Sequence, residues 1–414
     1  MITKPRGTVD ILGKKMRELV ALKLIIRNIM DLYNFEEIET PIFESLDLFK
    51  RAVGEETDIV SKEMFTFEDK KGRQLALRPE GTAPTVRMVL EERLFIPENL
   101  PLKMFYFGPM FRYERPQNGR QRQFTQFGVE VYGSNEYVTD VETISLSVEI
   151  LKAIGITDLS CHINYLVSGD ERKKYVEDLK NALSDKPLCE DCKVRFEKNP
   201  LRVLDCKIDG DKFGDVVNMK DYLSVEDQEK FDAILASLKQ IGIDCVVDKL
   251  LVRGLDYYTG VVFEIKSHDK NLGAQSTMLG GGRYNKLVEE LGGPSIPAVG
   301  FAIGLERVLL ALESVEDLAE PKSVDAFIFP IGKKAEQASI LVSTILRSAG
   351  ISCDLNHLNK NLKSAFKLIE RINAKNIIII GDEELKNNSV TIKNQETKTE
   401  EKVSFDKIVD YFEK

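Results

Sequence analysis

The spacing of apolar residues near the N-terminus predicts a long helix. One helical face is marked by residues that recur at intervals of three and four, namely Leu19, Leu22, Ile26, Ile29 and Tyr33. Leu24, Ile25 and Met30 widen this face until the helix is apolar nearly all round. A helix of that kind is usually buried, here against its own domain or against a second subunit.

Short stretches that alternate apolar and polar side chains follow, which is typical of strands. We predict strands at 35–43, 64–67, 74–78, 103–107, 124–132 and 159–165, with a helix at 140–154. Pro41 should end the first of them, because proline cannot donate to a strand ladder. The turn at 69–72 should join the second and third strands into a hairpin.

The second half of the chain divides into three parts by its pattern. Residues 168–245 are charged and helical in character, which indicates a helical insertion between strand-rich segments. A charged linker is expected at 314–323. Beyond it, strands at 326–330, 351–355 and 376–380 alternate with helices at 335–349 and 362–374, which predicts a small α/β domain with a parallel sheet.

Composition narrows the class of protein. The chain has 414 residues, 43% of them hydrophobic, and a net charge of −9, so it does not resemble a general polyanion-binding protein. The stretch from Leu19 to Tyr33 is interrupted by charges, and no segment reaches the length of about 20 apolar residues that a membrane span needs. We therefore expect a cytoplasmic protein without a membrane partner.

Six cysteines in a chain of this length do not form a disulfide framework. Cys189 and Cys192, with Cys206 downstream, resemble half of a zinc site. The three histidines lie far from them in the sequence, and structural zinc sites close with four ligands. The sequence therefore assigns no metal ligand and leaves open whether these three cysteines bind metal.

Polar and aromatic residues gather in three stretches. Residues 251–260 place Arg253, Tyr257 and Tyr258 between two glycines that suit backbone bends. Residues 78–84 put a carboxylate and Gly81-Thr82 at the start of a helix, and 111–130 form two strands joined by a basic loop. A pocket for a small, partly anionic, phosphate-bearing ligand is one interpretation; solvated surface turns are the other.

Taken in order, these stretches resemble the motifs of class II aminoacyl-tRNA synthetases. The first helix and strand resemble motif 1, Phe111–Glu114 with 124–130 resembles motif 2, and Gly300–Arg307 resembles motif 3. The segments 78–82, 253–258 and 281–284 resemble sequences specific to the histidyl-tRNA synthetase family. The resemblance runs over nearly the whole chain in the family's order.

This resemblance implies the fold and the reaction. We expect an α+β catalytic domain with an antiparallel sheet at 1–320, interrupted by the helical insertion at 168–245, and an α/β anticodon-binding-like domain at 324–414. We expect activation of L-histidine with ATP, accompanied by Mg²⁺, to histidyl-adenylate and pyrophosphate, and then transfer to tRNA(His). Such catalysis depends on positioning and charge stabilisation.

The resemblance also implies roles for individual residues. Arg112 and Arg253 are the expected catalytic cations at the α-phosphate, an arginine being permanently charged with a planar set of donors. The remaining ATP-binding residues are Glu114, Arg120, Phe124 and Arg307, with Phe124 stacking on adenine. Glu80, Thr82 and Gln126 would hold the ammonium group of histidine, and Gly81, Arg112 and Arg253 also belong to the expected histidine site.

The imidazole of histidine has one donor and one acceptor nitrogen. Glu130 would accept from one and Tyr258 would donate to the other, while Tyr257 and Tyr284 line the same pocket.

The alternative to an enzyme is a histidine-sensing regulatory subunit of ATP phosphoribosyltransferase, which usually lacks the C-terminal domain and the arginine at position 253. The first helix implies a homodimer, and the loop at 115–122, the insertion and the last domain are the expected tRNA contacts.

Overall fold

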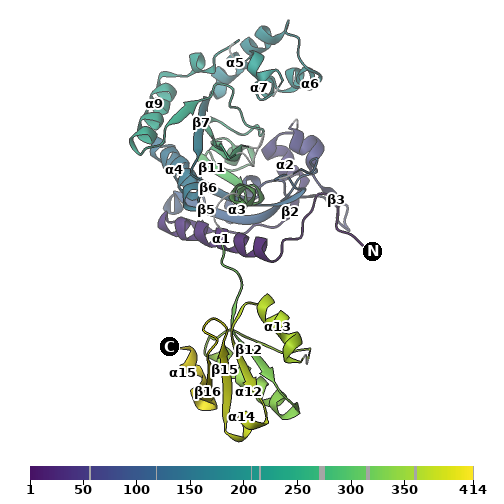
Figure 1. Ribbon diagram of the computed structural model, residues 1–414. Helices are drawn as coiled ribbons and strands as arrows, with labels where there is room; N and C mark the ends of the chain where they lie inside the picture. The colour runs from purple at the N-terminus through teal and green to yellow at the C-terminus, as the bar shows by residue number, and fades with distance from the viewer. Residues whose placement is uncertain are drawn as a thin grey trace. The chain divides into compact units, whose positions relative to one another are not determined.

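The computed structural model describes the chain except for residues 56, 118, 207, 214–215, 270–275, 314–317, 359–360 and 414. The described chain forms two compact units, Met1–Ala319 and Glu320–Lys414 (Figure 1). Residues 314–317 of the expected linker lie outside the described residues. Each unit is described by itself below.

An eight-stranded sheet is the centre of the first unit. Its order is β1-β5-β6-β11-β10-β9-β7-β8. The strands are β1 (Glu36–Glu37), β5 (Leu102–Phe111), β6 (Gln123–Tyr132), β7 (Leu159–Leu166), β8 (Cys245–Val247), β9 (Gly260–Ser267), β10 (Thr277–Arg283) and β11 (Ala298–Gly304). The six inner strands pair antiparallel, and only the edge strands β1 and β8 pair parallel. The antiparallel sheet expected from the sequence is confirmed.

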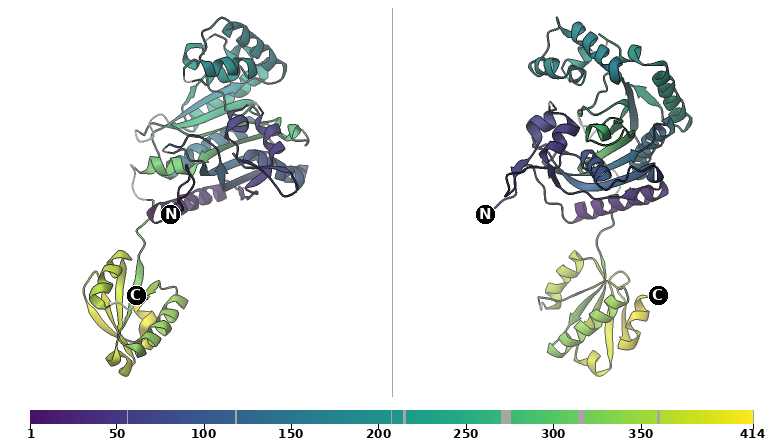
Figure 2. Two further views of the ribbon diagram at one scale, coloured as in Figure 1. Left: turned by 90° about the vertical axis from the view of Figure 1, so that its right-hand side faces the viewer. Right: turned by 180° about the vertical axis from the view of Figure 1, so that it is seen from behind.

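Four helices cover one face of this sheet. They are α1 (Lys14–Leu32), α4 (Tyr137–Ala153), α9 (Val225–Gln240) and α11 (Leu305–Leu312), and α1 and α4 are seen along the sheet in Figures 1 and 2. Their apolar side chains pack on Phe127, Val129 and Val131 of β6 in one continuous core. Because side chains alternate along a strand, Gln126, Gly128 and Glu130 face the opposite side.

The opposite side of the sheet is bordered by smaller elements. A three-stranded sheet, β2 (Phe43–Ser45), β4 (Gln74–Leu77) and β3 (Thr66–Glu68), lies in the same unit. Helices α2 (Leu46–Val53), α3 (Thr82–Glu91) and α10 (Leu287–Glu290) pack with residues of β6 and β9 in a second core. Shorter helical turns occur at Ile59–Glu63, Pro97–Asn99 and Met219–Tyr222.

One detail of the sequence prediction was wrong. The strand expected at 35–43 is two short strands, β1 and β2. Between them the Arg78 guanidinium donates to the carbonyl oxygens of Thr40 at 2.7 Å and Pro41 at 3.3 Å, in place of a strand ladder. Helix α1 buries Leu22, Ile26 and Met30 in its own unit, whereas Val20 and Leu24 on its other side are 54% and 57% exposed.

The stretch 168–245 is helical, as expected. It contains α5 (Gly169–Leu183), α6 (Glu190–Lys198), α7 (Leu201–Leu204), α8 (Gly210–Phe213) and α9. Its last helix is nevertheless part of the main helical layer, because Phe231, Ile234 and Leu238 of α9 lie in the core beneath the sheet. Helices α5 to α8 are thus the part of this stretch that lies outside that layer.

The second unit is a five-stranded sheet of order β13-β12-β14-β15-β16. The strands are β12 (Val324–Pro330), β13 (Cys353–Leu355), β14 (Ala374–Ile380), β15 (Ser389–Asn394) and β16 (Glu400–Ser404). The first three pair parallel, as the sequence predicted, and the last two extend the sheet antiparallel. Its helices are α12 (Lys333–Ser348), α13 (Leu362–Arg371), α14 (Asp382–Lys386), the turn Phe405–Lys407 and α15 (Ile408–Phe412).

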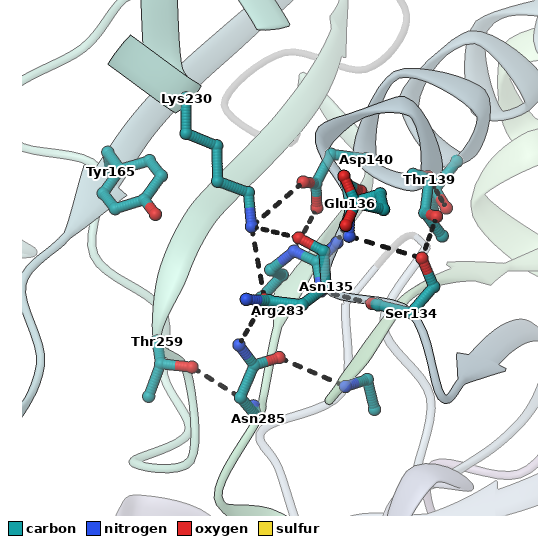
Figure 3. Close-up of polar contacts among 12 residues, drawn as sticks. Ser134, Asn135, Glu136, Thr139, Asp140, Tyr165, Lys230, Thr259, Arg283 and Asn285 are labelled. Atoms are coloured by element: carbon teal, nitrogen blue, oxygen red, sulfur yellow. Dashed lines mark hydrogen bonds and ion pairs between the residues drawn. The ribbon is translucent and has the colours of Figure 1, made fainter. Parts of the chain in front are cut away.

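A buried ion pair joins the sheet of the first unit to its helices. Arg283 at the end of β10 is 1% exposed, and its Nε lies 2.5 Å from the carboxylate of Asp140 on α4, which is 0% exposed (Figure 3). The other guanidinium nitrogens donate to the carbonyl oxygens of Ser134 and Glu136 at 2.9 and 3.1 Å. Lys230 of α9 lies 4.0 Å from the second oxygen of Asp140.

Replacing Asp140 with alanine should therefore destabilise the first unit strongly. Removing one partner of a buried pair leaves the other charge without compensation, at a cost of about 3–5 kcal/mol. Calorimetric unfolding of the full chain measures the effect as a lowered melting temperature. Lys173→Ala is the control, because it breaks an exposed ion pair with Asp170 on α5. Equal melting temperatures of the two variants would contradict the structural role of Asp140.

Candidate active site

A cavity of about 630 Å³ opens above the face of the sheet opposite α1 and α4. Most of the residues singled out in the sequence line it, although they come from segments far apart in the chain. They are Glu80, Thr82, Arg112, Glu114, Arg120, Phe124, Gln126, Arg253, Tyr257, Tyr258, Tyr284 and Arg307. Gly81 begins helix α3 beside them, and Glu130 lies just beneath.

Glycines on the central strands leave room for this cavity. Gly128 of β6 pairs with Tyr106 of β5, and a side chain at Gly128 would overlap the Tyr106 ring. In the same way, a side chain at Gly280 of β10 would overlap the Arg253 guanidinium. Large polar side chains can therefore lie flat on the sheet only because these positions have no Cβ.

Three arginines converge at one end of the cavity. Arg112 follows β5, Arg120 lies in the loop before β6, and Arg307 is on α11. Burial lowers the pKa of Arg307, and the nearby charges of Arg120 and Arg112 lower it further. Glu114 pairs with Arg120 at 3.0 Å. Because like charges repel, such a cluster is stabilised by an anion, and phosphates suit it.

Phe124 lies beside this cluster. The guanidinium carbon of Arg112 lies 5.4 Å from the centre of its ring, within the range of a cation–π contact. The Arg112 Nε donates to the carbonyl oxygen of Pro79 at 2.8 Å, which fixes the side chain. An aromatic ring next to converging cations can hold a planar base beside its phosphates.

Arg253 occupies the middle of the cavity and is held by Glu264 of β9, with which it forms a short ion pair. Glu264 also accepts from the hydroxyl of Thr277 at 3.1 Å. The carbonyl oxygen of Thr277 in turn accepts from Arg307 at 2.5 Å. The two arginines are therefore positioned by one connected set of hydrogen bonds on β9 and β10.

Glu130 lies at the other end, in a cluster of hydroxyl groups. Its carboxylate accepts from Thr82 at 2.8 Å, from Tyr106 at 3.3 Å and, in a short contact, from Tyr284. It is 1% exposed, and burial raises its pKa to about 8. A carboxyl group with such a pKa can exchange a proton near neutral pH.

The tyrosine rings form one wall of this end. Tyr257 lies 4.7 Å from Tyr258 and 5.6 Å from Tyr284, measured between ring centres. Burial raises the pKa of Tyr258, so its hydroxyl keeps its proton and can donate a hydrogen bond. The aromatic wall and the buried acceptor suit a small ring that carries both a donor and an acceptor.

Glu80 has a structural contact in addition to facing the cavity. Its two carboxylate oxygens accept from the backbone N–H groups of Thr82 and Ala83 at 2.6 and 2.9 Å. N–H groups in the first turn of a helix have no acceptor within the helix, so Glu80 caps α3 by accepting from them. Burial raises the pKa of Glu80. The hydroxyl of Thr82 is engaged by Glu130, a contact that sequence analysis did not foresee.

Sequence analysis missed several residues of the cavity. Glu264, Thr277 and Asp205 line it, and Glu306 does so while accepting from the backbone N–H of Thr125 at 2.7 Å. Glu264 had a usable signal, since it is a carboxylate within the otherwise apolar stretch Val261–Ile265. Asp205 belongs to the helical stretch 168–245, and nothing in its local pattern connects it with the sheet.

An antiparallel sheet that carries converging arginines on one face, joined to a separate α/β unit, is the architecture of a class II aminoacyl-tRNA synthetase. Comparison with known proteins agrees. A family profile described as Histidyl-tRNA synthetase matches residues 7–185 and 212–308, and one described as Anticodon binding domain matches 325–414. The chain belongs to the histidyl-tRNA synthetase family, and its catalytic unit is that of an aminoacyl-tRNA ligase.

Individual relatives cover nearly the whole chain. The Histidine--tRNA ligase of Mesoplasma florum is 47% identical over 99% of this chain and 90% of its own length. The Histidine--tRNA ligase of Geobacillus sp. is 45% identical over 98% of this chain and 97% of its own length. The apo S. aureus histidyl-tRNA synthetase has a TM-score of 0.85 and 37% identity, covering 100% of both chains.

A solved structure described as an ATP phosphoribosyltransferase regulatory subunit/histidyl-tRNA synthetase from Bacillus halodurans has a TM-score of 0.66 at 22% identity and shows only a shared fold. The relatives at higher identity are named as ligases, so the regulatory-subunit interpretation has less support. Among the described residues, no helix is long and apolar enough to cross a membrane.

The pKa of Glu130 predicts a pH-dependent stability. Since burial raises this pKa from 4.5 to about 8, the folded chain keeps a proton that the unfolded chain loses above pH 4.5. Stability should therefore fall as the pH rises from 4.5 to 8. Glu130→Gln cannot titrate, so its melting temperature should fall less over this range than that of the parent. The exposed Glu177→Gln on α5 is the control, and an unchanged slope in Glu130→Gln would refute the assignment.

Proposed function

We propose that the chain activates L-histidine with ATP and transfers it to tRNA(His). The observation that carries this proposal is the convergence of Arg112, Arg253 and Arg307 in one cavity with Tyr258. Thr82 lines the same cavity, and its hydroxyl donates to the buried Glu130 carboxylate. A carboxylate oxygen of histidine attacks the α-phosphorus of ATP, and the bond to pyrophosphate breaks. A hydroxyl of the terminal tRNA ribose then attacks the histidyl carbonyl and AMP leaves.

In this proposal ATP lies over the arginine end of the cavity. Phe124 stacks on adenine and Glu114 accepts from its exocyclic amine. Arg112 and Arg253 contact the α-phosphate, while Arg120 and Arg307 contact the distal phosphates. Fixed guanidinium donors stabilise the negative charge that develops during transfer without having to reorganise. The hydrogen bonds from Arg112 to Pro79 and from Arg307 to Thr277 support that rigidity.

Mg²⁺ accompanies the nucleotide. The carboxylate of Glu306 lines the arginine end, and one or two carboxylates combined with substrate phosphates are the ligands that Mg²⁺ prefers. The residues present therefore fit the ion, which when bound would neutralise charge on the departing pyrophosphate.

Histidine occupies the tyrosine end. Glu130 accepts from one imidazole nitrogen and the hydroxyl of Tyr258 donates to the other, with Tyr257 and Tyr284 enclosing the ring. Glu80, Gly81, Thr82 and Gln126 surround the ammonium group. An amino acid that lacks either imidazole nitrogen leaves a buried polar partner unpaired, and such losses can reach ~10⁴-fold in polar pockets.

ATP–pyrophosphate exchange with each of the twenty amino acids tests this proposal. We expect exchange with histidine far above exchange with the other amino acids, followed by charging of tRNA(His). Tight histidine binding without exchange would instead favour a histidine sensor. Within the same assay, Arg253→His should lower kcat by at least about 10²-fold with a smaller change in the KM for histidine. Arg73→His, at the exposed turn between β3 and β4, is the control.

We further propose that the chain forms a homodimer through the exposed side of α1, where Met16, Val20 and Leu24 present apolar surface. Sedimentation at micromolar concentration should give the mass of two chains. Val20→Glu should shift the protein toward monomer, because it places a charge in the interface. Val225→Glu, at an exposed valine on α9, should leave the mass unchanged. A monomeric parent protein would exclude the dimer.

A further inference from the structure

Four side chains with metal-ligand chemistry meet outside the cavity, in the segment of α6 to α8. They are Cys189, Cys192, Cys206 and Asp209, and their sulfur and carboxylate oxygen atoms all lie within 4.8 Å of one another. In the sequence they form two pairs, each with two residues between its members. This short spacing is typical of zinc sites.

The distance between two of the sulfurs distinguishes a metal site from a disulfide. The Sγ atoms of Cys189 and Cys206 are 3.8 Å apart. A tetrahedral site with Zn–S bonds of about 2.3 Å has sulfur–sulfur edges of about 3.8 Å. A disulfide needs about 2.05 Å. The Cys189–Cys206 distance therefore fits two ligands of one tetrahedral ion and is too long for a disulfide.

Backbone hydrogen bonds hold the four groups in place. The N–H of Ile208 donates to the Sγ of Cys206 at 3.4 Å, a contact that stabilises negative charge on sulfur. The N–H of Cys189 donates to one carboxylate oxygen of Asp209 at 2.8 Å. Cys189 also begins helix α6, which carries Cys192 in its first turn. The two pairs are thus tied to each other by a bond that does not involve a metal.

The second carboxylate oxygen of Asp209 points to a ligand. Asp209 is 1% exposed, and this oxygen has no hydrogen-bond donor among the described residues. The nearest described cation, Lys212 Nζ, lies 3.7 Å away and is itself largely exposed. A buried carboxylate oxygen without a donor is costly unless a cation compensates it.

We propose that Cys189, Cys192, Cys206 and Asp209 bind one zinc ion. Three thiolates and one carboxylate satisfy the four-coordinate preference of zinc, and thiolate ligands favour zinc over magnesium or calcium. All four positions are filled by protein, so the ion is structural and leaves no position for substrate.

The proposed zinc site lies beside residues that contact the loop carrying Arg253. Between Cys192 and Cys206 the chain contacts the segment that carries Arg253. Asn199 donates to the Asp256 carboxylate at 2.7 Å, and Arg202 donates to the carbonyl oxygen of Gly254 at 3.4 Å. Asp205, next to Cys206, lines the cavity itself. The ion would therefore brace residues 199–206 against the loop that positions Arg253.

Metal analysis of the full chain, purified under reducing conditions without added chelator, tests the proposal. We expect about one zinc per chain. After removal of the zinc, titration with cobalt(II) should give the visible absorption of a tetrahedral thiolate site, and zinc should abolish it. Bound zinc should also protect three of the six thiols from a thiol reagent and raise the melting temperature.

Variants separate a specific site from incidental binding. Cys192→Ser and Asp209→Asn should each weaken cobalt binding at least about ten-fold, and Asp209→Asn preserves the shape of its side chain if the cysteine variant does not fold. Cys353→Ser in the second unit is the control and should bind as the parent does. Absence of bound metal and of a cobalt spectrum, or a disulfide between Cys189 and Cys206 in the reduced preparation, would overturn the proposal.

Discussion

Arg283 and Asp140 form an ion pair that is sealed from solvent, and the arrangement of the first unit depends on it. Moving either charge out of water is costly, so each is tolerable only beside the other. The pair connects β10, at the centre of the sheet, with α4, and Lys230 brings α9 to the same point. Tyr284 follows Arg283 directly in the chain, so the ion pair also fixes where the tyrosine wall of the cavity begins.

The charged side chains of the cavity follow the same rule, that a buried charge needs a compensating partner. Glu130, Glu80, Arg253 and Arg307 are each held by neighbouring donors or acceptors before any ligand arrives. Glycines at 128 and 280 let the polar side chains approach the sheet. A site whose charges are already positioned loses little free energy to reorganisation when substrate binds. The elevated pKa of Glu130 reflects this enclosure.

The helical stretch 168–245 has two structural roles. Its last helix packs under the sheet, and its α6–α8 segment contacts the Arg253 loop through Asn199 and Arg202. Sequence analysis identified Cys189, Cys192 and Cys206 but found no fourth ligand, because it considered only histidine and cysteine. Asp209 repeats the two-residue spacing after Cys206, a signal that was present in the sequence.

Local pattern was sufficient to predict many elements of this chain. Patterns among neighbouring residues predicted the strand at 124–132 and the helix at 19–33. They also predicted the alternating strands and helices beyond 324, and the structure contains all of these elements. The family motifs similarly identified Arg112, Arg253 and Arg307 by local sequence. The division of the strand at 35–43 could not be predicted, since it depends on Arg78.

The sequence by itself determined the family, the main elements and many of the polar and aromatic residues that line the cavity. Only the tertiary structure decided their partners: Glu264 for Arg253, Tyr106 and Thr82 for Glu130, Asp140 for Arg283 and Asp209 for the cysteines. The physical reason is the distance along the chain over which each effect acts. Propensity and periodicity act over a few residues, whereas burial and charge compensation join groups that only the folded sheet brings within a few ångströms.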